Sequence, residues 1–401
     1  MGIVLFGAVY SCSPTKPVVS KQNVAANYQP TADIGISADH LMQHDSMLVW
    51  LRFGNRDLFK GRLPSDLVLQ IRVSPTYEST EPVYLDSVWL QENQVQWQAD
   101  KAVFRLGIPR AQLVQNGVLS LTLIDRVGEQ KNSFDLPLTT GALDKQYVVL
   151  ESNSALPLFR HFANPTDSFR IVAAEPNVTV KATRYKADFP AALPPMSLSA
   201  KKVAPTIPVL DSAELPTLVP FALTKPGLYA VQPSQGSGGI MLVEEDGYPE
   251  LTTARDLIEP LLYITTSKER NALYQSVDPK KAVDQFWLDI GGTEGFARTL
   301  IKSYYSRVTD ANQLFTSHKQ GWKTDRGMIY IVMGRPTAVH RYADREEWTY
   351  AAGKDQPTTE FVFYRKEHTL TKNHYELLRN PVFEPVWYRA AEKWRKGITD
   401  L

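Results

Sequence analysis

The first third of the chain alternates apolar and polar residues with the two-residue period of half-buried β-strands. Turn formers such as Gly54-Asn55 and Asn116-Gly117 separate the alternating or apolar runs, which fall at 46–53, 67–73, 83–90, 95–106 and 118–124. No helical period intervenes between them. Residues 31–145 are therefore expected to form a β-sandwich of immunoglobulin-like architecture, although the Cys-Trp-Cys signature of true immunoglobulin domains is absent.

Residues 146–249 again have a β pattern, but a looser one. Eight prolines fall at irregular spacing within 190–226, where neither a helical nor an alternating period survives. That stretch is predicted to be a long extended loop that could wrap a neighbouring domain. Strands are expected at 169–173, 178–185 and 240–244. The glycine-rich segment 235–239 is interpreted as a hairpin tip, because the helix and the Lys-Ser/Thr pair of a phosphate-binding loop do not follow it.

From about residue 250 the apolar period becomes helical. Asp278-Pro279 is a helix start, Gly291-Gly292 a helix end, and Thr293 a cap for the next helix. Helices are predicted at 253–265, 279–290, 293–315 and 384–396. Strands are predicted at 328–333, 338–342, 346–350, 360–365 and 374–378. Residues 250–401 are therefore expected to form an α+β domain with helices packed on one face of an antiparallel β-meander.

The overall prediction is a multi-domain chain with two β-sandwich-like domains followed by this α+β domain. A length of 401 residues agrees with two or three domains. Lys plus Arg (44) nearly balances Asp plus Glu (43), so no global charge favours nucleic acid as a partner. The 27 prolines favour loop-rich, β-dominated structure.

The single cysteine, Cys12, follows an apolar run that is too short to span a bilayer, which takes about 20 residues. Residues 9–12 resemble a bacterial lipobox, in which the cysteine becomes the lipidated first residue of the mature protein. The run lacks Lys and Arg, and Tyr10 is bulky for its place. A cleaved signal or a buried N-terminal strand is the alternative. We expect a lipoprotein-type signal at 1–12 and a polar tether at 13–30.

The densest group of conformationally special residues runs from Gly321 to Pro336. Its sequence, Gly-Trp-Lys-Thr-Asp-Arg-Gly followed by Tyr330, Gly334 and Pro336, resembles the GWxTD domain family, which is found mainly in Bacteroidota. The resemblance spans about 250–395 and includes Trp348 and Tyr350. It implies an envelope lipoprotein with a β-rich N-terminal region, and it implies no established chemistry.

The motif is explained by structural roles alone. Thr324 and Asp325 are expected to bond nearby backbone N–H groups, and Gly327 to adopt a backbone angle that other residues resist. Arg326 is expected to pair with Glu346 or Glu347, and Trp322 to fill the interface between helices and sheet. The segment 334–336 is expected to form a hairpin turn into the next strand.

A catalytic interpretation uses the same residues. Asp325 with Glu346 or Glu347 could form the carboxylate pair that glycoside hydrolysis needs, and Trp348 and Tyr350 could stack on a sugar. Two aromatics on one strand face are more simply explained by core packing. Metal-ligand spacings and a serine-nucleophile elbow are absent, and the seven histidines are scattered along the sequence. No catalytic residue, metal or cofactor is therefore assigned.

The expected function is that of a lipid-anchored outer-membrane protein that acts as a non-catalytic binding or scaffolding subunit of a protein complex. Its partners would be other envelope or outer-membrane proteins and the membrane itself, through the lipid, with no nucleic acid. The residues after Cys12 lack an acidic cluster, which favours the periplasmic face over the cell surface. The alternative is a carbohydrate-binding or carbohydrate-processing envelope lipoprotein.

Overall fold

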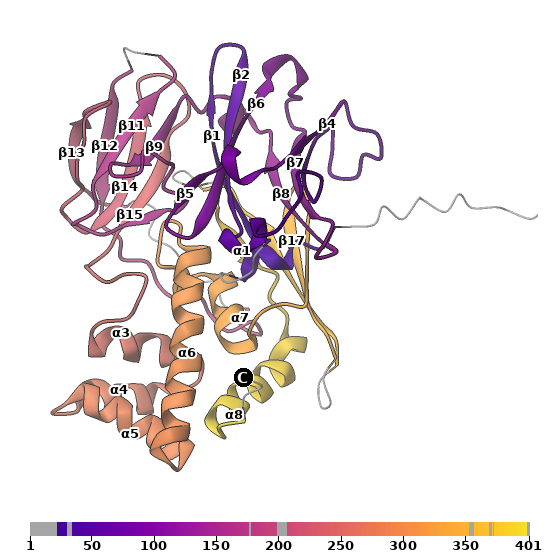
Figure 1. Ribbon diagram of the computed structural model, residues 1–401. Coiled ribbons are helices and arrows are strands. Elements are labelled where there is room, and N and C mark those ends of the chain that lie inside the picture. Colours follow the sequence, from indigo (N-terminus) through magenta and orange to yellow (C-terminus); the bar gives the residue numbers. More distant parts are fainter. Residues whose placement is uncertain are drawn as a thin grey trace, which may run out of the picture.

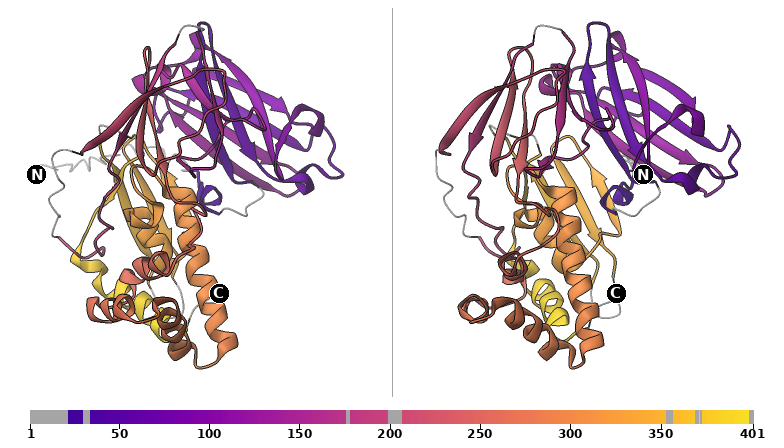
Figure 2. Two further views of the ribbon diagram at one scale, coloured as in Figure 1. Left: turned by 90° about the vertical axis from the view of Figure 1, so that its left-hand side faces the viewer. Right: turned by 60° about the vertical axis from the view of Figure 1, so that its left-hand side comes forward.

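The computed structural model describes residues 22–29, 34–175, 178–198, 207–352, 357–368, 371 and 373–398. Antiparallel sheets fill the N-terminal part, and most helices lie at the opposite end, with the C-terminal sheet between them (Figures 1 and 2). Among the described residues, no helix is long and apolar enough to cross a membrane. Cys12 lies outside these residues, so the predicted lipid anchor stays a prediction.

Two four-stranded antiparallel sheets form the first β-rich region. The predicted strands are present, except that the run 95–106 is divided by a turn into two paired strands. One sheet has the order β1 (Ile36–Met42), β2 (Ser46–Phe53), β6 (Lys101–Pro109), β5 (Gln96–Gln98). The other has the order β4 (Tyr84–Trp89), β3 (Leu67–Ser74), β7 (Val118–Asp125), β8 (Gln130–Pro137). Buried side chains of both sheets, such as Leu51 and Leu69, belong to one apolar cluster. Short helical turns connect the strands: α1 (Arg56–Phe59), η2 (Glu92–Gln94), η3 (Arg110–Gln112) and α2 (Thr140–Leu143).

The second β-rich region contains a two-stranded sheet and a five-stranded sheet. The first pairs β9 (Tyr147–Glu151) with β11 (Phe169–Ala173). The second has the order β10 (Phe162–Ala163), β15 (Gly239–Val243), β14 (Gly227–Pro233), β12 (Val180–Tyr185), β13 (Val209–Leu215). Only β10 runs parallel to its neighbour, β15, among the described pairs of this sheet.

Strand β13 corrects the prediction of an uninterrupted loop over 190–226. Residues 209–215 contain no proline, so their backbone N–H groups are free to pair with β12. Earlier in the same segment, the Ala192 N–H donates to Lys323 O (2.9 Å), and the Asn380 N–H donates to Pro195 O (3.0 Å). This part of the proline-rich segment therefore runs along the C-terminal region, as the wrapping interpretation expected.

The C-terminal helices form largely where the apolar period places them. They are α3 (Ala254–Ile258), η4 (Glu259–Tyr263), α4 (Ser267–Gln275), α5 (Pro279–Gly291), α6 (Glu294–Phe315), η6 (Pro381–Phe383) and α8 (Glu384–Arg395). Asp278 and Thr293 accept bonds from the first turns of α5 and α6, as expected of N-caps. Helix α4 was not predicted, because it buries only Leu273 and so has no apolar stripe.

The C-terminal sheet confirms the predicted meander with one correction. Its order is β16 (Ala338–Arg341), β17 (Arg345–Tyr350), β18 (Thr359–Arg365), β19 (Tyr375–Leu377). The segment 328–333, expected as the first strand, instead belongs to helix α7 (Asp325–Met333), which follows the turn η5 (Gly321–Lys323). Every residue from Arg326 to Val332 is buried, and a short run that is apolar on all sides has no period to separate helix from strand.

Two glycines allow α6, η5 and α7 to meet backbone to backbone. A Cβ on Gly321 would overlap the carbonyl oxygen of Ala311 in α6, and a Cβ on Gly327 would overlap the carbonyl oxygen of Gly321. Gly327 has an ordinary helical conformation, so the positive backbone angle expected for it is wrong. The need for glycine comes from close approach.

We predict that Gly327→Ala lowers the free energy of unfolding by about 3 kcal/mol, at the upper end of overpacking costs, because the clash is with backbone that has no room to move. Gly295→Ala is the matched control, since Gly295 lies in α6 with open space around its Cα. It should leave stability unchanged or raise it by up to about 1 kcal/mol. Urea denaturation measures both, and wild-type stability of Gly327→Ala would contradict the packing argument.

Candidate functional site

The first turn of α7 is built by Thr324 and Asp325. The Thr324 Oγ1 accepts the Gly327 N–H (3.0 Å) and donates to Gly321 O (2.7 Å), as the predicted turn chemistry requires. Asp325 does not bond its own turn. Its Oδ2 accepts the Leu377 N–H of β19 (2.7 Å), and its carboxylate pairs with Arg379. The aspartate of the motif therefore joins α7 to the last strand of the sheet.

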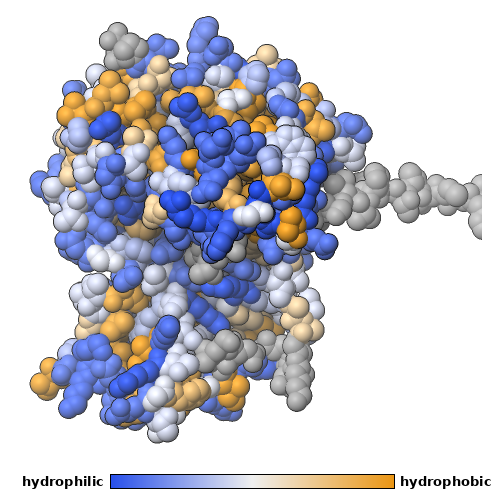
Figure 3. Space-filling model, viewed as in Figure 1, coloured by the Kyte–Doolittle hydropathy of each residue, from blue (hydrophilic) through white to orange (hydrophobic). Residues whose placement is uncertain are grey.

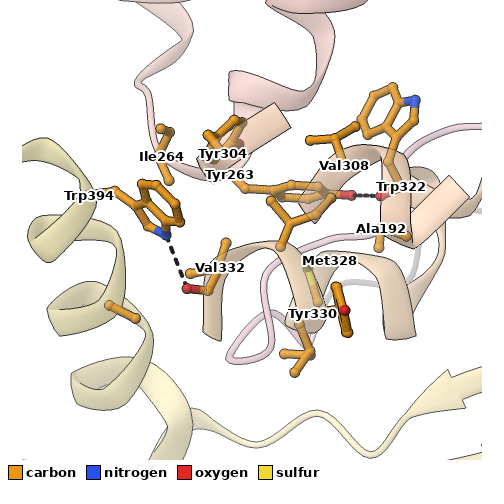
Figure 4. Packing of buried hydrophobic residues seen from close by; sticks show 14 of the residues in the cluster. Ala192, Tyr263, Ile264, Tyr304, Val308, Trp322, Met328, Tyr330, Val332 and Trp394 are labelled. Atoms are coloured by element: carbon orange, nitrogen blue, oxygen red, sulfur yellow. Dashed lines mark hydrogen bonds between the residues drawn. The ribbon is translucent and has the colours of Figure 1, made fainter. Parts of the chain in front are cut away.

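Trp322 is 4% exposed and fills the space between η4, α6 and α7. Its carbonyl accepts the Tyr263 hydroxyl (2.9 Å), a contact drawn in Figure 4. Its backbone N–H donates to Oδ1 of the fully buried Asn312 (3.1 Å), and its indole N–H donates to Gln320 Oε1 (2.7 Å). Trp322 is therefore packed among helices, whereas it was expected at the interface between helices and sheet.

The segment 334–336 connects α7 to β16, so the hairpin turn expected there is wrong. Gly334 ends the helix with φ of +88°, in the region that favours glycine. Its carbonyl accepts the Tyr350 hydroxyl (2.9 Å). Pro336 is buried, and the Tyr330 hydroxyl donates to Asp310 Oδ2 (3.1 Å). The Tyr350–Gly334 bond holds the end of α7 against the sheet, and the Tyr330–Asp310 bond joins α7 to α6.

The carboxylate of Glu346 is the most heavily bonded group of this region, and it is 1% exposed. Arg326 approaches its Oε2 (3.5 Å), as expected, and Arg341 donates to its Oε1 (3.0 Å). The Tyr28 hydroxyl (2.7 Å) and the Trp348 indole N–H (3.2 Å) also donate to it. Burial alone would raise the pKa of Glu346, but the two arginines and the hydrogen bonds hold it at about 2.

The N-terminal segment 22–28 takes part in this centre. Within it, η1 (Ala25–Tyr28) is packed in the C-terminal core, and the Val24 N–H donates to Val339 O of β16 (2.9 Å). The Asn27 side chain reaches the other way, to Ser133 O (2.6 Å) and the Ile36 N–H (2.8 Å) of the first sheets. The described part of the predicted tether is therefore packed, and it connects the two halves of the molecule.

The catalytic interpretation of these residues finds no support in the geometry. Asp325 and Glu346 are each neutralised by arginines of their own, and neither bonds the other. Trp348 is fully buried and Tyr350 is 8% exposed, so neither presents a face on which a sugar could stack. Core packing explains both aromatics.

A cleft of about 530 Å³ opens beside the Glu346 centre, between the first sheets and the C-terminal sheet. Arg326, Arg341 and Glu346 line one wall, and the start of β1 lines the opposite wall. The face shown in Figure 3 is hydrophilic at the level where the β-rich and helical parts meet. Of the motif residues, only Arg326 lines this cleft, so the others act behind its wall.

Sequence reasoning missed several residues of this arrangement. Arg341 lies opposite Glu346 in the β16–β17 ladder, so a hairpin register could have indicated their pairing. No sequence pattern indicated that Tyr28 bonds Glu346 or that Arg379 pairs with Asp325, because the two residues of each pair are far apart in the sequence.

Three histidines that are far apart in the sequence meet beside the motif. His318, which follows α6, stacks on His368 with a centroid distance of 4.5 Å, and His374 lies 5.0 Å from His318. These three histidines are scattered along the sequence but come together in the fold. In the part of the chain that the structure describes, no group has the arrangement of a metal site. Burial lowers the pKa of His318 to about 2.

Comparison with known proteins agrees with the resemblance. Residues 227–396 match the family model of the GWxTD domain, so the match begins earlier than residue 250 and includes β14 and β15. A search of curated proteins found no match.

The buried His318 predicts acid sensitivity. Its pKa is about 2 in the folded chain and near 6.5 in the unfolded chain, so the unfolded state binds one proton more at intermediate pH. Through this residue the free energy of unfolding therefore falls by about 1.4 kcal/mol for each pH unit below 6.5. His318→Gln should reduce the slope of unfolding free energy by about 1 kcal/mol per unit between pH 6 and 4.5.

Denaturation series at several pH values measure that slope. Glu346, with an ordinary pKa of 4.5, also takes up protons in the unfolded chain in the lower part of this window, but it does so equally in wild type and variant, so the difference between their slopes reports His318. His44→Gln, at an exposed position, is the control and should retain the wild-type slope. Equal slopes for wild type and His318→Gln would show that the buried imidazole is not the source.

Proposed function

We propose that this protein, which carries a GWxTD domain, is a non-catalytic binding or scaffolding subunit of a protein complex at the bacterial outer membrane. Its motif residues support this proposal because their polar groups are engaged in contacts within the chain. The carboxylates that acid–base chemistry would need are held in ion pairs. Binding would then take place on surfaces that the motif keeps in position.

The observation that carries the proposal is the exposed edge strand β13. Its residues from Val209 to Glu214 are all exposed, including Val209 (60%) and Leu210 (48%). It pairs with β12 on one side, and no other described strand pairs with it. A strand with unpaired backbone groups and exposed apolar side chains is a template for an added strand of another chain.

The β-rich part is proposed to consist of two sandwich-like domains of immunoglobulin type. The single apolar cluster shared by the first two sheets supports this assignment for the first region. The five-stranded and two-stranded sheets support it for the second region, where Phe169 of β11 and Tyr229 of β14 pack in one cluster.

The membrane contact is proposed to be a lipid on Cys12, with the protein on the periplasmic face. The lipobox-like sequence of residues 9–12 supports this. A lipid anchor would raise the local concentration of weak strand-addition contacts at the membrane.

The strand-addition proposal predicts that Val209→Lys with Leu210→Lys reduces partner capture at least fivefold in a crosslinking pull-down from native membranes. Lysines on an edge strand oppose the approach of a second strand, and both side chains are exposed, so the melting temperature should not change. Leu63→Lys, at an apolar position that is 65% exposed and lies outside this sheet, is the control. Equal capture by the β13 variant and wild type would refute docking at β13.

The lipid proposal predicts that Cys12→Ser moves the protein from the membrane fraction to the soluble fraction and leaves the N-terminal segment uncleaved at this site. Fractionation and mass spectrometry of the N-terminus measure both properties. Unchanged membrane fractionation with an unchanged N-terminus would exclude lipidation of Cys12.

A further inference from the structure

The cleft beside Glu346 carries more positive than negative charge. Its acidic groups are Asp135 and Glu346, and its basic groups are Arg52, Lys101, Arg160, Arg326, Arg341 and Arg365. Glu346 pairs with both Arg326 and Arg341, so these three side chains together carry a net positive charge. The Asp135 carboxylate accepts the Ser120 hydroxyl (2.6 Å), and burial raises its pKa, which weakens its negative charge further.

Three of the cations form no ion pair with a described carboxylate. Arg52 bonds only the side-chain oxygen of Gln98 (3.4 Å), and Arg365 donates to the carbonyl of Ala343. Lys101 lines the same cleft and forms no ion pair with a described residue. Since Arg160 is paired with Asp167, these three are the charges that remain for a ligand. A partly buried cation without a partner favours an anion that would share its low-dielectric surroundings.

The opposite wall offers backbone groups. Strand β1 is the edge of its sheet, and residues 36–38 line the cleft. At the end of the β1–β2 hairpin, the Gln43 N–H donates to Ser46 O. Backbone groups of successive residues in a strand point to opposite sides, so the N–H and C=O of the even-numbered residues of β1 point away from β2. The outward N–H groups of Ile36, His40 and Met42 are occupied: they donate to Asn27 Oδ1, Asp39 Oδ1 and Lys145 O. Ala38 lies between them, and its outward N–H has no partner among the described residues.

We propose that this cleft binds an extended acidic segment of a polypeptide. The segment would add to β1 through the N–H and C=O of Ala38, and its carboxylates would face Lys101, Arg365 and Arg52. The outward N–H of Ala38 favours a peptide over an acidic glycan, because a peptide amide can accept from this N–H and donate to the Ala38 C=O at the same point of the strand. This site is separate from the β13 edge, so it does not depend on the function proposed above.

Binding of a fluorescein-labelled eight-residue peptide of alternating Glu and Thr to the full chain tests the proposal by fluorescence anisotropy. The same peptide with Gln in place of Glu is the ligand control. We expect the Glu peptide to bind at least tenfold more tightly at low salt, with the difference shrinking as salt increases. Equal affinity for the two peptides would overturn the proposal.

Variants locate the site. Lys101→Glu should weaken binding of the Glu peptide at least tenfold, whereas Lys131→Glu, the same charge change at an exposed position of β8 outside the cleft, should change it less than twofold. If Lys101→Glu lowers the melting temperature, Lys101→Gln removes the charge more conservatively and should still weaken binding. Similar losses in the Lys101 and Lys131 variants would indicate non-specific charge attraction and refute the cleft.

The backbone contact and the ligand class have their own test. Ala38→Pro removes the outward N–H without changing charge, and proline is tolerated at such edge positions. This variant should weaken binding of the Glu peptide at least fivefold and leave the melting temperature unchanged. Oligogalacturonate, an acidic glycan, should not compete at equal concentrations of carboxylate. Full competition by the glycan, or unaffected peptide binding by Ala38→Pro, would overturn the assignment to a polypeptide.

Discussion

The buried carboxylate of Glu346 is the interaction on which the rest of this structure depends. Removing a carboxylate from water costs several kcal/mol, and the cost is offset only where cations and hydrogen-bond donors surround it. Here Arg326 and Arg341 supply the cations. The Tyr28 hydroxyl donates from a position 318 residues away in the sequence. One charge therefore fixes helix α7, strands β16 and β17, and the N-terminal segment relative to one another.

That arrangement gives the family motif a physical meaning. Gly321 and Gly327 bring three backbone segments into contact, and Asp325 attaches α7 to β19. Arg326 is the one motif residue that reaches the cleft wall. The motif therefore stabilises the contacts among α6, α7 and the C-terminal sheet, next to the N-terminal sheets. The surfaces proposed for binding, the exposed edge strand and the basic cleft, lie outside the motif, apart from Arg326 in the cleft wall.

The sequence predicted those parts of the fold in which local chemistry and burial agree. Helix α6 has an apolar stripe and a Thr293 cap, and the strands of the first sheets have a clear two-residue period. Helix α7 was mistaken for a strand because it is buried on all sides. Strand β13 was missed because its exposed side chains carry no apolar alternation.

The sequence predicted one polar pair of the candidate site and missed others, including the Arg341–Glu346 pair of the β16–β17 hairpin. The Arg326–Glu346 pair was expected from complementary charge and is present. Asp325 pairs with Arg379, and His318 stacks on His368, although the partners are far apart in the sequence. Residue spacing in the sequence does not predict contacts over such separations. Long-range polar contacts of this kind are specified by the assembled fold.

Glu346 couples the N-terminal segment to the C-terminal sheet. A double-mutant cycle with Tyr28→Phe and Glu346→Gln, followed by urea denaturation, measures that coupling directly. We predict a coupling energy of at least about 1 kcal/mol, because the hydrogen bond is to a charged group. The same cycle with Glu360→Gln, at an exposed position of β18, should be additive. Additivity of Tyr28→Phe with Glu346→Gln, within about 0.3 kcal/mol, would show that Glu346 does not couple the two parts of the chain.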